Sequence, residues 1–112
     1  MDLPDTSKVF DIKGKVALIT GATGGFGTIA CKTMAAAGAK VMVTGRSEDK
    51  LRILVDDLNS TGAEAAYSVG SPEKYEDVQK VVNDTVAAFG GIDILITAAG
   101  VNIFGTIAEQ SI

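Results

Sequence analysis

A glycine-rich segment holds the residues whose types and spacing point most directly to chemistry. It reads Thr20-Gly-Ala-Thr-Gly-Gly-Phe-Gly27 and directly follows a short apolar run. A diphosphate needs close approach of the backbone and free N–H groups at the start of a helix. Glycine permits both the tight turn and the close approach. The segment therefore predicts a phosphate-binding turn between a strand and a helix.

The glycines of this turn have separate expected roles. Gly21 turns the chain, and Gly25 lets the phosphates approach. Gly27, together with Ala30, lets the helix pack closely on the strand. The residues expected to contact the ligand are Gly21, Thr23, Gly24, Gly25, Phe26 and Gly27.

Two other interpretations of the turn compete with dinucleotide binding. A P-loop would need a lysine inside the glycine-rich turn to reach the phosphates. No lysine occurs between Lys15 and Lys32, so P-loop kinase and ATPase chemistry is excluded. A glycine-rich turn without a ligand is the second interpretation. The position of the motif between a predicted strand and a predicted helix favours nucleotide binding over it.

The absence of histidine narrows the chemistry further. Because the sequence contains no His, it excludes a Ser-His-Asp triad, a Cys-His pair and a His-ligated metal site. Cys31 is the single cysteine, which excludes an intrachain disulfide. Without a His partner it is expected to be a small buried hydrophobe. No residue is therefore assigned as catalytic, and none as a metal ligand.

Alternating strands and helices must position the turn. Short apolar runs predict strands at 16–20, 40–44, 63–69 and 92–97, and helical periodicity predicts helices at 25–37, 48–58 and 72–89. Gly38 is expected to end the first helix, and Ser47 and Ser71 to cap the other two, with Pro72 at a first helical position. Residues 98–112 are expected to be mainly loop. This alternation predicts an α/β fold with a parallel sheet and right-handed crossovers.

Each predicted helix carries an apolar face that is expected to be buried. The first face consists of Phe26, Ile29, Ala30, Thr33, Met34 and Ala37. The second consists of Leu51, Leu54, Val55 and Leu58, and the third of Val78, Val81, Val82, Thr85, Val86 and Phe89.

Two motifs resemble the short-chain dehydrogenase/reductase family. Thr20-Gly-x-x-x-Gly-x-Gly27 resembles its first-turn fingerprint, and Thr97-Ala-Ala-Gly100 resembles its Asn-Asn-Ala-Gly strand end. The resemblance covers nearly the whole chain. It implies a Rossmann-type doubly wound sheet with strand order 3-2-1-4, a nicotinamide cofactor, and hydride transfer between that cofactor and a carbonyl or alcohol.

The sequence departs from the family pattern in its cofactor contacts. Thr97-Ala98 replaces the family's Asn-Asn, although Ala98, Ala99 and Gly100 are still implied as backbone contacts. Ser68-Val69 stands where the family usually carries Asp-Val. By this resemblance the Ser68 hydroxyl accepts from the adenine amino group, but without charge.

The catalytic Tyr-x-x-x-Lys of the family has no counterpart here. Tyr67 is followed four residues later by Ser71, and Tyr75 by Gln79. The resemblance therefore predicts a lead-in at 1–14 and a cofactor-binding Rossmann half at 15–112, truncated before the catalytic half. Residues 1–112 alone are expected to be inactive. A non-catalytic nucleotide-binding or scaffold module on the same fold is the alternative.

Residues after the second strand indicate the cofactor. An NAD-preferring site carries a carboxylate there, but this sequence has Gly45 followed by Arg46. A guanidinium pairs well with a 2′-phosphate, and Ser47 and Thr23 add hydroxyl donors. We therefore expect NADP(H) to be favoured over NAD(H), although Gly24 occupies a position that is basic in many NADP-dependent relatives.

Composition and charge limit the partners. The chain of 112 residues has a net charge of −4, so no nucleic-acid partner is expected. The acidic start does not resemble a signal peptide, and no apolar run is long enough to span a membrane. A cytoplasmic enzyme acting on a small alcohol or carbonyl substrate is expected. A homo-oligomer is also expected. Residues 1–112 alone are separately expected to self-associate, because 92–97 would form an open apolar edge.

Overall fold

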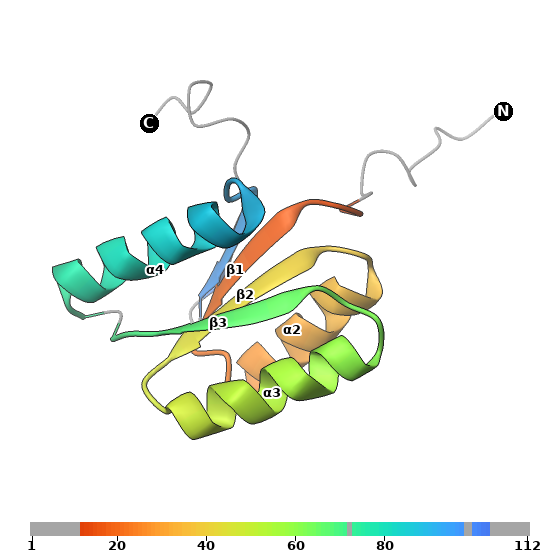
Figure 1. Cartoon of the computed structure of the whole chain (residues 1–112), viewed down its shortest axis with the longest axis horizontal. Helices are drawn as coiled ribbons and strands as arrows, with labels where there is room; N and C mark the ends of the chain where they lie inside the picture. The colour runs from red at the N-terminus through yellow and green to blue at the C-terminus, as the bar shows by residue number, and fades with distance from the viewer. Residues whose placement is uncertain (1–11, 72, 98–99, 104–112) are drawn as a thin grey trace, which may run out of the picture.

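The computed structural model describes residues 12–71, 73–97 and 100–103 (Figure 1). As far as residue 97, strands and helices alternate as the sequence predicts, and one further strand follows. The elements are β1 (Val16–Thr20), α2 (Gly25–Ala36), β2 (Lys40–Gly45), α3 (Glu48–Ser60), β3 (Ala65–Val69), α4 (Tyr75–Phe89), β4 (Ile94–Thr97) and β5 (Gly100–Ile103).

The sheet has the strand order β3-β2-β1-β4-β5. The first four of these strands are parallel, which confirms the predicted 3-2-1-4 Rossmann-type arrangement. Helices α2 and α3 cover one face, and α4 covers the other (Figure 1). Because Thr20 pairs with Thr44 and Gly45 with Val69, the carboxyl ends of β1, β2 and β3 meet at one edge. The glycine turn that follows β1 begins at this edge.

Two apolar clusters hold the three layers together. One lies between the sheet and α2 and α3, and it includes Ile19, Val43 and Leu51. The smaller one joins the sheet to α4 through Leu18, Met42 and Val81. All four residues of the apolar face predicted for α3 are buried, as expected from their spacing: Leu51, Leu54, Val55 and Leu58.

The predicted helix ends are partly confirmed. The Ser47 hydroxyl caps α3 by accepting from Lys50 N at 3.4 Å. Gly38 lies just beyond α2 with a φ of +93°, a conformation that favours glycine. The cap predicted for α4 is wrong, because α4 begins at Tyr75 with Lys74 as its N-cap. Ser71 instead stands in a turn before the helix, where its backbone N–H donates to Asp77 Oδ2 at 2.9 Å.

The buried face predicted for α2 is wrong for its large side chains. Phe26 and Ile29 are 55% and 66% exposed, whereas the buried residues are Gly27 and Cys31. Thr33 and Ala37 are exposed as well, while Ala30 and Met34 pack against the core as expected. Gly27 faces the backbone of the turn that follows β1, where an added Cβ would clash with Gly21 O, so this side of α2 has no room for a large side chain.

The face predicted for α4 is correct only in part. Val81 and Thr85 are buried, but Val78 and Val86 are 43% and 47% exposed. Val82 and Phe89 are partly buried. A single helix lies on this face of the sheet in the described residues, so the sides of α4 have no neighbouring helix to cover them.

The open edge predicted at 92–97 is also wrong. The strand begins at Ile94, and β5 pairs with it antiparallel, so Gly100–Ile103 forms a strand within the stretch expected to be loop. Asp93, just before β4, makes two hydrogen bonds with Val16. Its side-chain Oδ2 accepts from Val16 N at 2.9 Å, and its backbone N–H donates to Val16 O. Because β5 supplies the missing ladder of hydrogen bonds, the argument for self-association through β4 no longer holds.

Candidate nucleotide-binding site

The glycine turn is closed by its own backbone. Gly21 has a φ of +66°, a conformation that side chains rarely adopt. Gly24 N donates to Gly21 O at 3.2 Å, and Thr28 Oγ1 donates to Ala22 O at 3.1 Å. Ala22 is fully buried beneath the turn. These contacts fix the direction in which α2 leaves the sheet.

Gly27 and Gly25 differ sharply in their surroundings. A Cβ added to Gly27 would clash with Gly21 O and would lie 2.8 Å from Ala22 Cα, so helix and turn are in backbone contact there. A Cβ added to Gly25 would meet nothing within 4 Å. Gly27 thus lies where the helix closely approaches the turn after β1, and Gly25 borders open space in front of the helix.

The amino end of α2 is free of competing groups. Its N-cap, Gly24, makes no side-chain cap, and its first turn carries no acidic residue. The first turns of α3 and α4 each carry two acidic residues, and Ser47 also caps α3. The first N–H groups of any helix lack partners within the helix. In the part of the chain that the structure describes, α2 is therefore the helix whose amino end suits an external anion.

Arg46 extends the site beyond the end of β2. Its guanidinium Nη2 lies 3.3 Å from Glu73 Oε1, on the loop that precedes α4. Ser47 follows it as the cap of α3. Thr23 is exposed on the glycine turn. Both hydroxyls therefore belong to loops at the same sheet edge as Arg46.

A hollow of about 400 Å³ lies between the sheet and the first turns of α4, next to Gly21. Its walls are largely apolar side chains such as Val81 and Leu95. Thr44 also lines it, and Thr44 Oγ1 is buried without a hydrogen-bond partner among the described residues. The hollow is narrow beside Gly70, because a Cβ added to this residue would lie only 3.1 Å from Val81 Cγ2. The hollow has a volume typical of small-ligand pockets.

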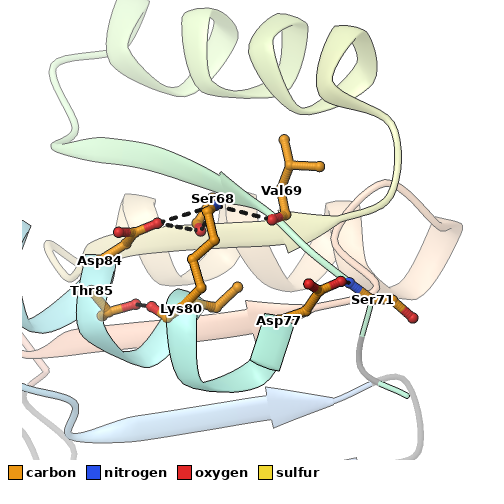
Figure 2. Close-up of polar contacts among 8 residues, drawn as sticks. Ser68, Val69, Ser71, Asp77, Lys80, Asp84 and Thr85 are labelled. Carbon is orange, nitrogen blue, oxygen red and sulfur yellow. Dashed lines mark hydrogen bonds and ion pairs between the residues drawn. The ribbon is translucent and has the colours of Figure 1, made fainter. Parts of the chain in front are cut away.

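A polar cluster that was not predicted from the sequence joins the end of β3 to α4 (Figure 2). Ser68 Oγ donates to Asp84 Oδ2 at 2.7 Å and accepts from Lys80 Nζ at 3.2 Å. Lys80 Nζ also donates to Val69 O at 3.2 Å. The spacing of Asp77, Lys80 and Asp84 by three and four residues places them on one helix face, which is the signal that would have revealed the cluster.

This cluster shifts the acidity of Asp84. The hydrogen bond from Ser68 is the main cause that lowers the pKa of Asp84 below its ordinary value, and Lys80 lowers it further against the opposing effect of burial. Ser68 itself is buried, with its hydroxyl proton committed to Asp84. Its predicted contact with an adenine amino group would use a lone pair that these bonds leave open.

The structure does not place the side chains of three predicted cofactor contacts, Ala98, Ala99 and Gly100. Ala98 and Ala99 lie outside the described residues, and Gly100 is described only through its backbone in β5, where it pairs with Thr97.

Cys31 is fully buried, and burial raises the pKa of its thiol to about 12, so it is no nucleophile. The described residues contain no group of three metal-ligating side chains. None of their helices combines the length and apolar character needed to cross a bilayer.

A glycine turn at the carboxyl edge of a 3-2-1-4 parallel sheet, leading into an uncapped helix, defines a Rossmann-type dinucleotide-binding domain. Residues 15–112 also match the family described as short chain dehydrogenase. The chain belongs to the short-chain dehydrogenase family, as the two sequence motifs predict.

Individual relatives agree with this assignment. An uncharacterised oxidoreductase of Thermotoga maritima is 42% identical over 101 residues, covering 90% of this chain and 39% of that protein. A short chain dehydrogenase/reductase from Burkholderia phymatum, solved in complex with NAD, is 34% identical with a TM-score of 0.74, covering 77% of this chain and 31% of that one. A variant of the actinorhodin polyketide ketoreductase, solved with NADPH, is 31% identical with a TM-score of 0.73, covering 87% of this chain and 37% of that one. The chain thus spans well under half the length of these relatives.

Proposed function

We propose that the protein is an NADP(H)-dependent oxidoreductase whose residues 15–112 hold the cofactor. The observation that carries the proposal is the uncapped amino end of α2 behind the glycine turn, at the sheet edge where Arg46 also lies. The open space at Gly25 and the hollow beside Gly21 fit a dinucleotide, and the hollow contains the Thr44 hydroxyl, which has no hydrogen-bond partner among the described residues.

Each part of the cofactor has a proposed place. The diphosphate binds the backbone of residues 23–26, where N–H groups and the helix dipole favour negative charge. The adenosine half lies toward Ser68 and Val69, and the ribose is contacted by the backbone of residues 98–100. The 2′-phosphate binds Arg46, with Ser47 and Thr23 as hydroxyl donors.

The bound nicotinamide supplies a hydride acceptor or donor for a small alcohol or carbonyl substrate. This chain's own residues bind and orient the cofactor, and none of them is proposed as catalytic. The polyketide ketoreductase among the relatives reduces a ketone by its name, which supports a carbonyl substrate. A cytoplasmic location and a homo-oligomeric state remain parts of the proposal.

The preference for NADP(H) is tested by Arg46→Ala in the intact protein. A charged hydrogen-bonded contact contributes about 1.5–3 kcal/mol, so NADPH affinity should fall by roughly 10- to 150-fold. NADH affinity should hardly change, because NADH has no 2′-phosphate. Fluorescence titration with each cofactor measures both.

Arg52→Ala is the matched control. Arg52 is also an exposed arginine in a surface ion pair, with Asp49 at 2.8 Å, but it lies on α3. Its loss should leave both affinities unchanged. Equal losses for NADPH and NADH in Arg46→Ala would refute the role given to Arg46.

A further inference from the structure

The guanidinium expected to bind the 2′-phosphate already has an anionic partner. Arg46 Nη2 lies 3.3 Å from Glu73 Oε1, and the two side chains are 66% and 79% exposed. Arg46 follows β2, whereas Glu73 belongs to the loop between β3 and α4. The ion pair therefore bridges two loops of the proposed cofactor edge.

The surroundings of this pair show which charges are able to rearrange. Arg46 and Glu73 line an open groove together with Lys74, Asp77 and Lys80. Asp77 is held by Ser71 N, on the loop after β3, and Lys80 by Ser68, Val69 and Asp84, so both side chains are held in place (Figure 2). No comparable backbone contact holds Glu73 Oε1 in the described residues, so its carboxylate is free to leave Arg46.

We propose that Glu73 is a specificity-determining residue that limits the preference for NADP(H) by competing with the 2′-phosphate for Arg46. This inference rests on the proposed function. An exposed ion pair is weak, whereas a guanidinium binds phosphate through strong bidentate contacts. The 2′-phosphate therefore displaces the Glu73 carboxylate from Arg46. The displaced carboxylate stays in the same groove and repels the phosphate. Each effect lowers the affinity for NADPH and leaves NADH unaffected.

The test is Glu73→Gln in the intact protein, with NADPH and NADH titrated separately at low ionic strength. Glutamine keeps the size of the side chain and removes its charge. NADPH affinity should rise by up to about fivefold, the most that an exposed pair usually contributes. NADH affinity should stay constant, and the gain should shrink as salt screens the charges.

Glu76→Gln is the matched control, because Glu76 is an exposed carboxylate in the first turn of α4 and is no part of the Arg46 pair. It reports the effect of a smaller negative charge alone. A second comparison adds Glu73→Gln to Arg46→Ala, where the gain should be smaller, because only the repulsion of the phosphate by the carboxylate is then removed.

Each other outcome overturns the inference. An equal gain in Glu76→Gln would mean that only overall charge matters. A loss of NADPH affinity in Glu73→Gln would mean that Glu73 orients Arg46 for the phosphate instead of competing with it. If the wild-type protein binds neither cofactor, the proposed function fails together with this inference. If it prefers NADPH but does not respond to Glu73→Gln, only the inference fails.

Discussion

Gly27→Ala should destabilise the protein by pushing α2 away from the glycine turn. The added Cβ would clash with Gly21 O and would lie 2.8 Å from Ala22 Cα. That second distance is about 0.7 Å short of the roughly 3.5 Å at which carbon atoms attract best. The neighbours are backbone atoms of a closed turn, so they cannot move aside as the end of a side chain would.

The size of the effect follows from two opposing contributions. Overpacking of a tight site costs about 1–3 kcal/mol, and backbone neighbours favour the upper end of that range. Replacing glycine by alanine in a helix returns at most about 1 kcal/mol. The free energy of unfolding should therefore fall by about 2 kcal/mol. With a urea dependence of about 2 kcal/mol per M, the unfolding midpoint should drop by roughly 1 M.

Gly25→Ala supplies the control in the same turn of the same helix. Its Cβ would meet nothing within 4 Å, so the free energy of unfolding should stay within about 0.5 kcal/mol of wild type. Its affinity for NADPH should fall, because the new methyl group occupies the space in front of the helix. Equal urea midpoints for the two variants would refute the close contact assigned to Gly27.

Two further predictions concern ionisable groups. Because the pKa of Asp84 is lowered from 3.8 in the folded protein, its carboxylate stabilises the fold above that pH, and the contribution is lost as the pH falls through the lower folded value. Asp84→Asn should therefore lower the free energy of unfolding at neutral pH and make it fall less as the pH is lowered. The change should be small because the Asp84 side chain is 47% exposed. An unchanged pH dependence in urea titrations would contradict this. Cys31, fully buried with a pKa of about 12, should resist iodoacetamide in the native protein and react once urea unfolds it. Rapid native labelling, read by mass, would show that the thiol is accessible.

Local patterns in the sequence were sufficient for the order and type of the elements from β1 to β4, but not for β5. Each apolar run or helical stripe is a property of a few neighbouring residues, and glycine at Gly21 and Gly38 marks the turns between them. The α3 face was predicted in full because its large apolar side chains repeat at helical spacing against a sheet that accepts them. The motif and the helix end of the site without a side-chain cap are equally local, so a phosphate-binding role for the turn could be proposed before the fold was known.

Contacts between distant segments lay beyond such patterns. The buried side of α2 depends on the close approach of the helix to the turn after β1, so Gly27 and Cys31 are buried while Phe26 remains exposed. The polar cluster of Ser68, Lys80 and Asp84 and the ion pair of Arg46 with Glu73 both depend on crossovers that bring separate segments together. Ion pairs of this kind leave no periodic trace in the sequence. Only the packed sheet, which sets the distances between its loops, determines which charges meet.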